Sequence, residues 1–218
     1  MPEALNQVPF IARLLALLVV LGLLAALDAW RSPEPRRAGE YGFLLACGAL
    51  AGAFGAGVDV GTVRLSPDYF VLGKGLEAGP SLTWRGPWLG FQAGFPAGLI
   101  AGGLLLLVNQ PRPQRPPLPY RQLARAPGWL LGCALLLIPA GAAIGRWLDP
   151  LDLTTQTRGL LDGPELVAFR TVWGIHAGVY AGALLGLGLA LWRVHRSRLR
   201  AAPLMPPEAG VSRPKEPR

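Results

Sequence analysis

The 218-residue sequence contains few of the residues that build catalytic and metal sites. It has two cysteines, two histidines and only 16% charged residues. Cys47 and Cys133 both lie in apolar stretches, without a CxxC spacing or a nearby histidine. This pattern argues against a disulfide framework or a zinc site and favours small packing residues. The motifs HExxH and GxSxG and the P-loop are also missing, so we expect no metal and no cofactor.

Long apolar stretches dominate the rest of the chain, which is 51% hydrophobic with a mean hydropathy of +0.36. Five of them, each about 20 residues long, can cross a hydrocarbon core of about 30 Å as a helix. They cover residues 9–30, 42–63, 88–108, 129–147 and 171–192. The gaps between them are too short for a folded soluble domain. The sequence therefore predicts an all-α, polytopic transmembrane helix bundle of about five spans, as one domain over residues 1–200.

The first stretch has an alternative interpretation as a signal peptide. Its apolar run from Arg13 to Asp28 has the length of a signal h-region. The residues before it hold no Lys or Arg, however, whereas a signal peptide has a positive n-region. We favour a retained helix; cleavage would leave four spans.

Charge predicts how the chain is oriented in the membrane. The net charge is +8, and most Lys and Arg fall in the first and third gaps and after the last stretch. By the positive-inside rule, these segments face the cytoplasm of a bacterial inner membrane and the N-terminus lies outside. Membrane orientation explains this charge better than nucleic-acid binding does. The loop after the second span is then extracytoplasmic, and the Pro-rich tail over residues 201–218 is a disordered cytoplasmic tail.

The third gap, residues 109–127, is rich in Pro and Arg and should be extended and solvated. The basic run just after the last span should act as an anchor at anionic lipid; it comprises Arg193, Arg196, Arg198 and Arg200.

Glycines recur every four residues in four of the spans and predict closely packed helices. The longest stripe is in the last span, with Gly174, Gly178, Gly182 and Gly186. Besides the lipid bilayer, the glycine faces could serve a second copy of the chain or a partner membrane subunit, and the sequence does not separate these from packing within the chain. Pro96 and Pro139 lie within spans, where they predict tolerated kinks or, less often, hinges.

Polar side chains inside spans are candidates for function because burying them in lipid is costly. Six gather near the outer ends of the spans: Arg13, Asp59, Gln92, Arg146, His176 and Tyr180. One interpretation is structural, with snorkelling side chains and ion pairs such as Asp59 with Arg13 or Arg64. The other is an outward-opening site. Asp28 lies at the opposite end, where we expect an interfacial ion pair.

The segment Val58 to Phe70 resembles a family of small bacterial multi-span membrane proteins. Their pattern is approximately H-D-Q-x-T-x-x-x-S-P-E-Y-F, and this chain matches it at Asp59, Thr62, Ser66, Pro67, Tyr69 and Phe70. A W-x-x-H-x-x-x-Y-x-G pattern in the last helix is similar to Trp173, His176, Tyr180 and Gly182. Val58, Val60 and Asp68 depart from the pattern. The family has no assigned function, and the missing histidine at position 58 argues against a shared two-histidine site.

Three functions fit these observations. We favour a non-catalytic structural or accessory membrane component, because no complete catalytic set is present. The alternative is an outward-facing ligand-binding or enzymatic site, in which Asp59 orients His176 as a general base. Its candidate ligand-binding residues are Arg64, Tyr69, Gln92, Arg146 and Tyr180. A transporter ranks third, because the cytoplasmic halves of the spans hold almost no polar side chains.

Overall fold

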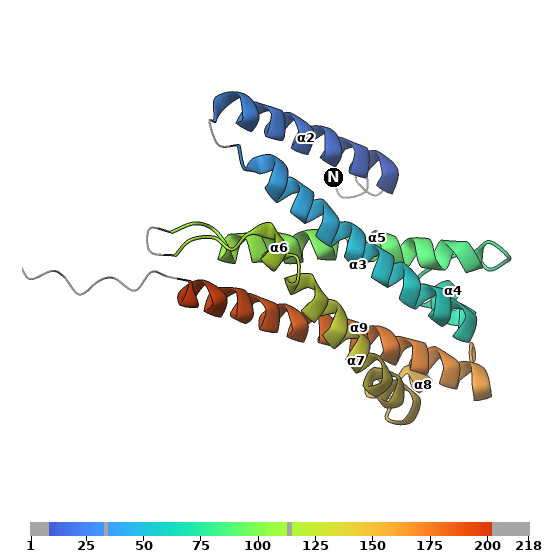
Figure 1. The fold of residues 1–218 in the computed structure, drawn as a ribbon. Helices are drawn as coiled ribbons and strands as arrows, with labels where there is room; N and C mark the ends of the chain where they lie inside the picture. Colours follow the sequence, from blue (N-terminus) through green and yellow to red (C-terminus); the bar gives the residue numbers. More distant parts are fainter. Residues whose placement is uncertain (1–8, 33–34, 113–114, 202–218) are drawn as a thin grey trace, which may run out of the picture.

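The computed structural model describes residues 9–32, 35–112 and 115–201, and these form a bundle of helices (Figure 1). Five helices are long and apolar enough to span a membrane, which confirms the predicted fold class. They are α2 (Phe10–Arg31), α3 (Arg37–Leu65), α5 (Leu82–Val108), α7 (Ala126–Trp147) and α9 (Gly163–Arg200). Short helices α4 (Pro67–Leu72), α6 (Tyr120–Leu123) and α8 (Leu153–Gln156) lie in the connections. The predicted disordered tail, apart from Ala201, lies outside the described residues.

Several helices extend well beyond the apolar stretches that predict them. The longest, α9, has 38 residues. At about 1.5 Å per residue it is nearly twice as long as the hydrocarbon core is thick, so its charged last turns project from the membrane. Pro96 and Pro139 lie inside α5 and α7 without ending either helix.

The long helices after α2 form two closely packed pairs. In the pair of α3 and α5, a Cβ atom added at Gly90 would collide with the carbonyl of Gly55, and one added at Gly98 with the carbonyl of Cys47. In the pair of α7 and α9, Gly174 and Gly141 approach in the same way. Glycine is required at these contacts because backbone meets backbone. Most of the predicted glycine faces are therefore used inside the chain, although Gly57 and Gly61 have open space beside them.

Helix α2 packs differently from the others and has no buried residue. It lies beside α3 at the edge of the bundle (Figure 1). Its contact with α5 is aromatic, with the Phe10 ring centroid 5.6 Å from that of Trp88 and 6.0 Å from that of Phe95. At its other end, the Asp28 carboxylate accepts hydrogen bonds from the backbone N–H groups of Arg36 and Arg37 at 2.8 and 2.9 Å. Asp28 thus caps α3, where we had expected an ion pair.

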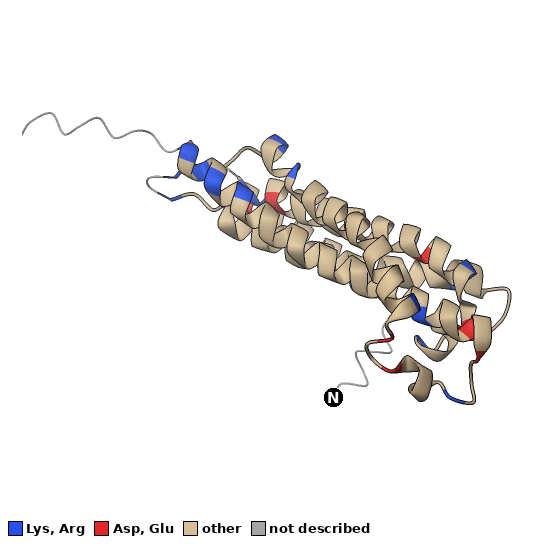
Figure 2. Cartoon of the chain, turned by 90° about the horizontal axis from the view of Figure 1, so that it is seen from below, with Lys and Arg blue, Asp and Glu red and all other residues tan. Residues whose placement is uncertain are grey.

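Positive charge gathers at the end of the bundle where α9 ends (Figure 2). One of these residues does not act as the predicted lipid anchor, because Arg198 is only 4% exposed. Its guanidinium donates hydrogen bonds to the carbonyl of Val108, the last residue of α5, and to three carbonyls of the connection that follows: those of Gln110, Arg115 and Pro116. The Pro-rich connection is non-helical there, so its carbonyls lack the regular donors of a helix, and Arg198 supplies some of them. The connection is thus attached to α9 rather than simply solvated.

Gly178→Ala should destabilise the bundle by about 1 to 3 kcal/mol, because the added methyl group would collide with the Leu137 carbonyl. Gly188 lies on the same helix with open space beside it, so Gly188→Ala is the matched control and should cost nothing. Reversible unfolding in detergent measures both. Equal stability of the two variants would contradict the close-packing account.

Candidate functional site

Asp59 of α3 and His176 of α9 meet at the end of the bundle opposite the positive cluster. The Asp59 Oδ1 and His176 Nε2 atoms are 3.4 Å apart. Both residues are buried, with 4% and 8% of their surfaces exposed. Asp59 therefore faces His176 rather than the suggested partners Arg13 and Arg64. The separation of 3.4 Å is within reach of a hydrogen bond, but the two side chains are not aligned to make one.

Helix α9 can hold His176 here because its two sides pack against different neighbours. Gly174 and Gly178 face α7, whereas His176, between them in sequence, faces α3 and α4. Residues two apart on a helix lie on opposite sides. The glycine side thus lets α9 approach α7, and the opposite side presents the imidazole to Asp59.

Tyr69 of α4 covers the imidazole. Its ring stacks on His176 with centroids 4.9 Å apart and an angle of 12° between the planes. Ser66 positions α4 as its N-cap, since its hydroxyl accepts a hydrogen bond from the Tyr69 N–H at 3.3 Å. The segment that follows the second predicted span thus begins with a short helix. Burial raises the pKa of the Tyr69 phenol, as do nearby Tyr180 and Asp59, so the phenol stays protonated.

Two residues near the pair were missed by the sequence reasoning. The Thr62 hydroxyl lies 3.4 Å from Asp59 Oδ1, one turn along α3. The Lys74 ammonium lies 5.4 Å from the Tyr69 ring centroid, within the range of a cation–π contact. Helical spacing could have indicated Thr62. Lys74 follows the end of α4, where no periodic pattern places its side chain.

The other candidate ligand-binding residues do not join the pair. Tyr180 is the nearest, with its ring centroid 6.4 Å from that of His176, but it is 54% exposed. Arg64 and Arg146 are exposed, and Gln92 is half-buried, with no side-chain hydrogen bond to another described residue. His195 is exposed near the far end of α9 and therefore cannot pair with His176.

The pair is buried. A hollow of about 360 Å³ lies at the opposite end of the bundle, lined by residues such as Arg36, Asn109 and Tyr120. His176 Nε2 is buried and has no hydrogen-bond partner with good geometry in the described structure. The described residues also contain no group of three side chains that could hold a metal ion. The arrangement is thus suited to holding a proton between a carboxylate and an imidazole.

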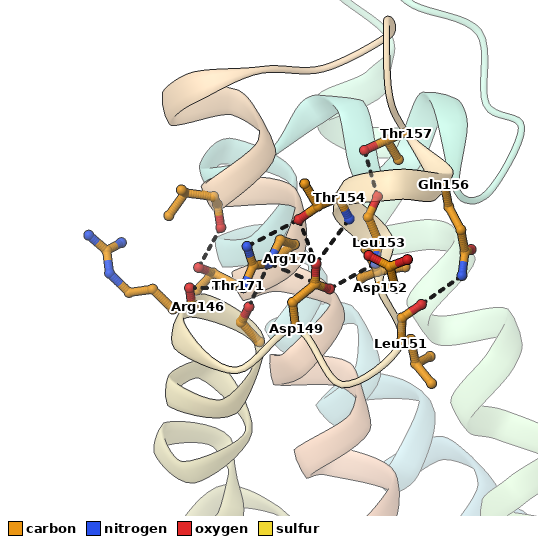
Figure 3. Close-up of polar contacts among 12 residues, drawn as sticks. Arg146, Asp149, Leu151, Asp152, Leu153, Thr154, Gln156, Thr157, Arg170 and Thr171 are labelled. Carbon is orange, nitrogen blue, oxygen red and sulfur yellow. Dashed lines mark hydrogen bonds and ion pairs between the residues drawn. The ribbon is translucent and has the colours of Figure 1, made fainter.

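A second polar cluster closes the same end of the bundle, between α7, α8 and α9 (Figure 3). Arg170 donates to the Gly145 and Arg146 carbonyls at 3.1 and 3.3 Å and lies 3.6 Å from the Asp149 carboxylate. Asp149 also accepts from the Leu153 and Thr154 N–H groups at 2.8 and 3.0 Å. The Arg146 side chain extends away from the cluster in the figure. These contacts fix the α7–α8 connection and give it a structural role.

No family model matches this chain, and no curated protein or solved structure matches it.

Asp149 should make the free energy of unfolding depend on pH in the acid range. Burial raises the pKa of its carboxyl. Hydrogen bonds from Thr154 and Leu153 and the charge of Arg170 lower this pKa by more, so that it lies below the ordinary value. Its contribution is therefore complete above the unfolded pKa of about 3.9 and is lost as the pH falls through the lower folded pKa. Asp149→Asn should cost about 1 kcal/mol at pH 7 and less towards pH 3. Unfolding in detergent at several pH values measures this, and a pH-independent cost would contradict it.

Proposed function

We propose that this chain is a multi-pass membrane protein whose outward-facing Asp59–His176 pair reversibly binds a proton, and that it serves as a proton-responsive accessory component of the membrane. The observation that carries the proposal is the buried contact of 3.4 Å between Asp59 and His176, whose Nε2 atom has no well-aligned partner. Imidazole is the side chain that ordinarily titrates between pH 5 and 8. Because the pair joins α3 to α9, the uptake of a proton changes the contact between the two helix pairs.

The charged and titratable groups around His176 fit this function. Asp59 approaches His176 from α3, and Tyr69 stacks on it from α4. Tyr180 lies on the same helix as His176, and the Lys74 ammonium lies over the Tyr69 ring. At high pH, the Asp59 carboxylate lies beside a neutral imidazole. When one proton is added, an aspartate–imidazolium pair or a protonated carboxyl beside neutral imidazole results, and in both the added proton can be shared in a hydrogen bond between Asp59 and His176. The stacked Tyr69 ring keeps water from competing for that bond.

The proposal also includes the family resemblance, which is supported by where the motif residues lie. Asp59, Ser66, Tyr69 and Phe70, which carry the first motif, and His176, from the second, gather around one contact. We therefore propose that this contact is what the family pattern encodes.

The proposal also includes an orientation, with the N-terminus outside and the C-terminus in the cytoplasm of a bacterial inner membrane. Its support is the positive charge around the end of α9 (Figure 2). In a chain with Cys47→Ala and Cys133→Ala, the exposed positions Ala78 and Ser197 offer a matched pair. Ala78→Cys should react with a membrane-impermeant maleimide on intact cells, and Ser197→Cys only after the cells are opened. The reverse pattern would exclude this orientation.

The proton-binding test uses the two histidines of the chain as site and control. In lipid nanodiscs, the ¹³Cγ signal of Asp59 and the ring ¹⁵N signals of His176 should change together with one midpoint, because coupled groups titrate as a pair. Asp59→Asn should alter the His176 transition and leave that of exposed His195 unchanged. Separate midpoints for Asp59 and His176, or no transition of either between about pH 4 and 9, would exclude the proposal.

An accessory role through direct subunit contact is the second candidate. The observation that favours it is the open space beside Gly57 and Gly61 on α3, which the contacts within the chain leave free. A second copy or a partner helix could pack there closely. Cross-linking from Gly61→Cys in membranes tests this candidate.

A further inference from the structure

The two helix pairs use glycine in the same register. Four glycines of α5 correspond, at one constant spacing, to the four glycines of α9: Gly90 to Gly174, Gly94 to Gly178, Gly98 to Gly182 and Gly102 to Gly186. The same spacing relates Gly79-Pro80, just before α5, to Gly163-Pro164, at the start of α9. Gly79 and Gly163 both have positive φ, 139° and 47°. A chance stripe of glycines would not also bring a Gly-Pro pair near the start of each helix into the same register.

The first helices of the two pairs, α3 and α7, correspond as well. Their equivalent residues are separated in sequence by two residues more than those of α5 and α9. Gly90 approaches the carbonyl of Gly55, and its equivalent Gly174 approaches the carbonyl of Gly141. Gly98 approaches the carbonyl of Cys47, and its equivalent Gly182 that of Cys133. A third contact, Gly94 with Ala51, is matched by Gly178 with Leu137. The contacts thus align α3 with α7 in a single register, in which the two cysteines of the chain are equivalent.

The short helices follow the register set by α3 and α7. Ser66 is the N-cap of α4 and Asp152 that of α8, at the spacing that separates Cys47 from Cys133. Gly73 and Gly159, which follow these short helices, keep the same spacing. The change of spacing then falls between the short helix and the next long one. A loop that differs by two residues is the ordinary way in which two related units diverge.

We propose that residues 43–107 and 129–191 are tandem copies of one helix–short helix–helix unit, and that the Asp59–His176 site is built across the two copies. The first copy supplies Asp59 from its first helix, and the second supplies His176 from its last helix. Both copies enter and leave on the same side of the membrane, as a direct duplication of an even number of spans requires.

Duplication assigns the counterparts of the site residues. Gln92 of α5 is the equivalent of His176, and Gly145 of α7 is the equivalent of Asp59. The contacts agree, because a Cβ atom at Gly90 would meet the Asp59 carboxylate and one at Gly174 would meet the Gly145 backbone. The second position therefore holds neither acid nor base, and Arg170 occupies its surroundings through the Gly145 carbonyl. The chain keeps one acid–base pair in a frame that has two equivalent places for it.

Exchanging the two copies in the full chain tests this inference. The exchanged chain keeps α2, then has α7 to α9, the connection 109–125, and α3 to α5, so every helix keeps its direction in the membrane. We expect it to insert in the membrane and to unfold cooperatively, with a Tm within a few degrees of that of the native chain. The control moves only α7 and α8 ahead of α3, which reverses the direction of α3 to α5, and it should not fold.

An experimental structure of the native chain is the second measurement. Superposing α3 to α5 on α7 to α9 should place Cys47 on Cys133 and Gly90 on Gly174. A best superposition in another register, or an exchanged chain that fails like the control, would overturn the inference. Neither readout depends on proton binding, so Asp59 and His176 can fail to titrate while the duplication stands.

Discussion

The contact on which the structure depends is backbone against backbone at glycine. In lipid, the hydrophobic effect does not drive helices together, so close approach has to supply dispersion contacts. Gly98 against the Cys47 carbonyl and Gly182 against the Cys133 carbonyl are two such contacts, one in each pair. Each pair is held along several turns, and this rigidity determines which side chains face the space between the pairs. The polar residues around Asp59 and His176 thus take positions set by residues without side chains.

Between the two pairs the interactions are of a different kind. A cluster of buried apolar side chains joins α4, α5, α8 and α9 at the end of the bundle opposite the positive charge, and it includes Phe70, Leu82, Leu153 and Val172. Asp59 and His176 lie at its edge, where a carboxylate and an imidazole leave water together. Such a pair is costly to bury and weak evidence for stability. The stability of the bundle is therefore better attributed to the glycine contacts and the apolar cluster than to this pair.

The sequence predicts much of this architecture, because span length, charge asymmetry and glycine spacing are local patterns. It also predicts that Asp59 and His176 lie near the same end of the bundle, since depth follows from position within each span. The sequence left their contact as one of two alternatives, beside an ion pair of Asp59 with an arginine, because the rotation of α9 depends on which of its sides packs on α7. Arg198 looked like any basic residue after a span; its partners lie far away in sequence, in and beside the Pro-rich connection. Lys74 was missed for a similar reason, since a turn after α4 directs it.

Helix α9 follows, in chain order, the groups that it contacts, and this order has a consequence for biosynthesis. Asp59 and the carbonyls of Gln110 and Pro116 are made long before His176 and Arg198, which contact them. Until α9 leaves the ribosome and inserts, the Asp59 carboxyl at one end of the bundle and these carbonyls at the other lack the contacts that α9 provides. Helix α9 then supplies both, one near each of its ends. The nascent chain is therefore incomplete at both ends of the bundle until α9 arrives, and a truncation before His176 would leave both ends open.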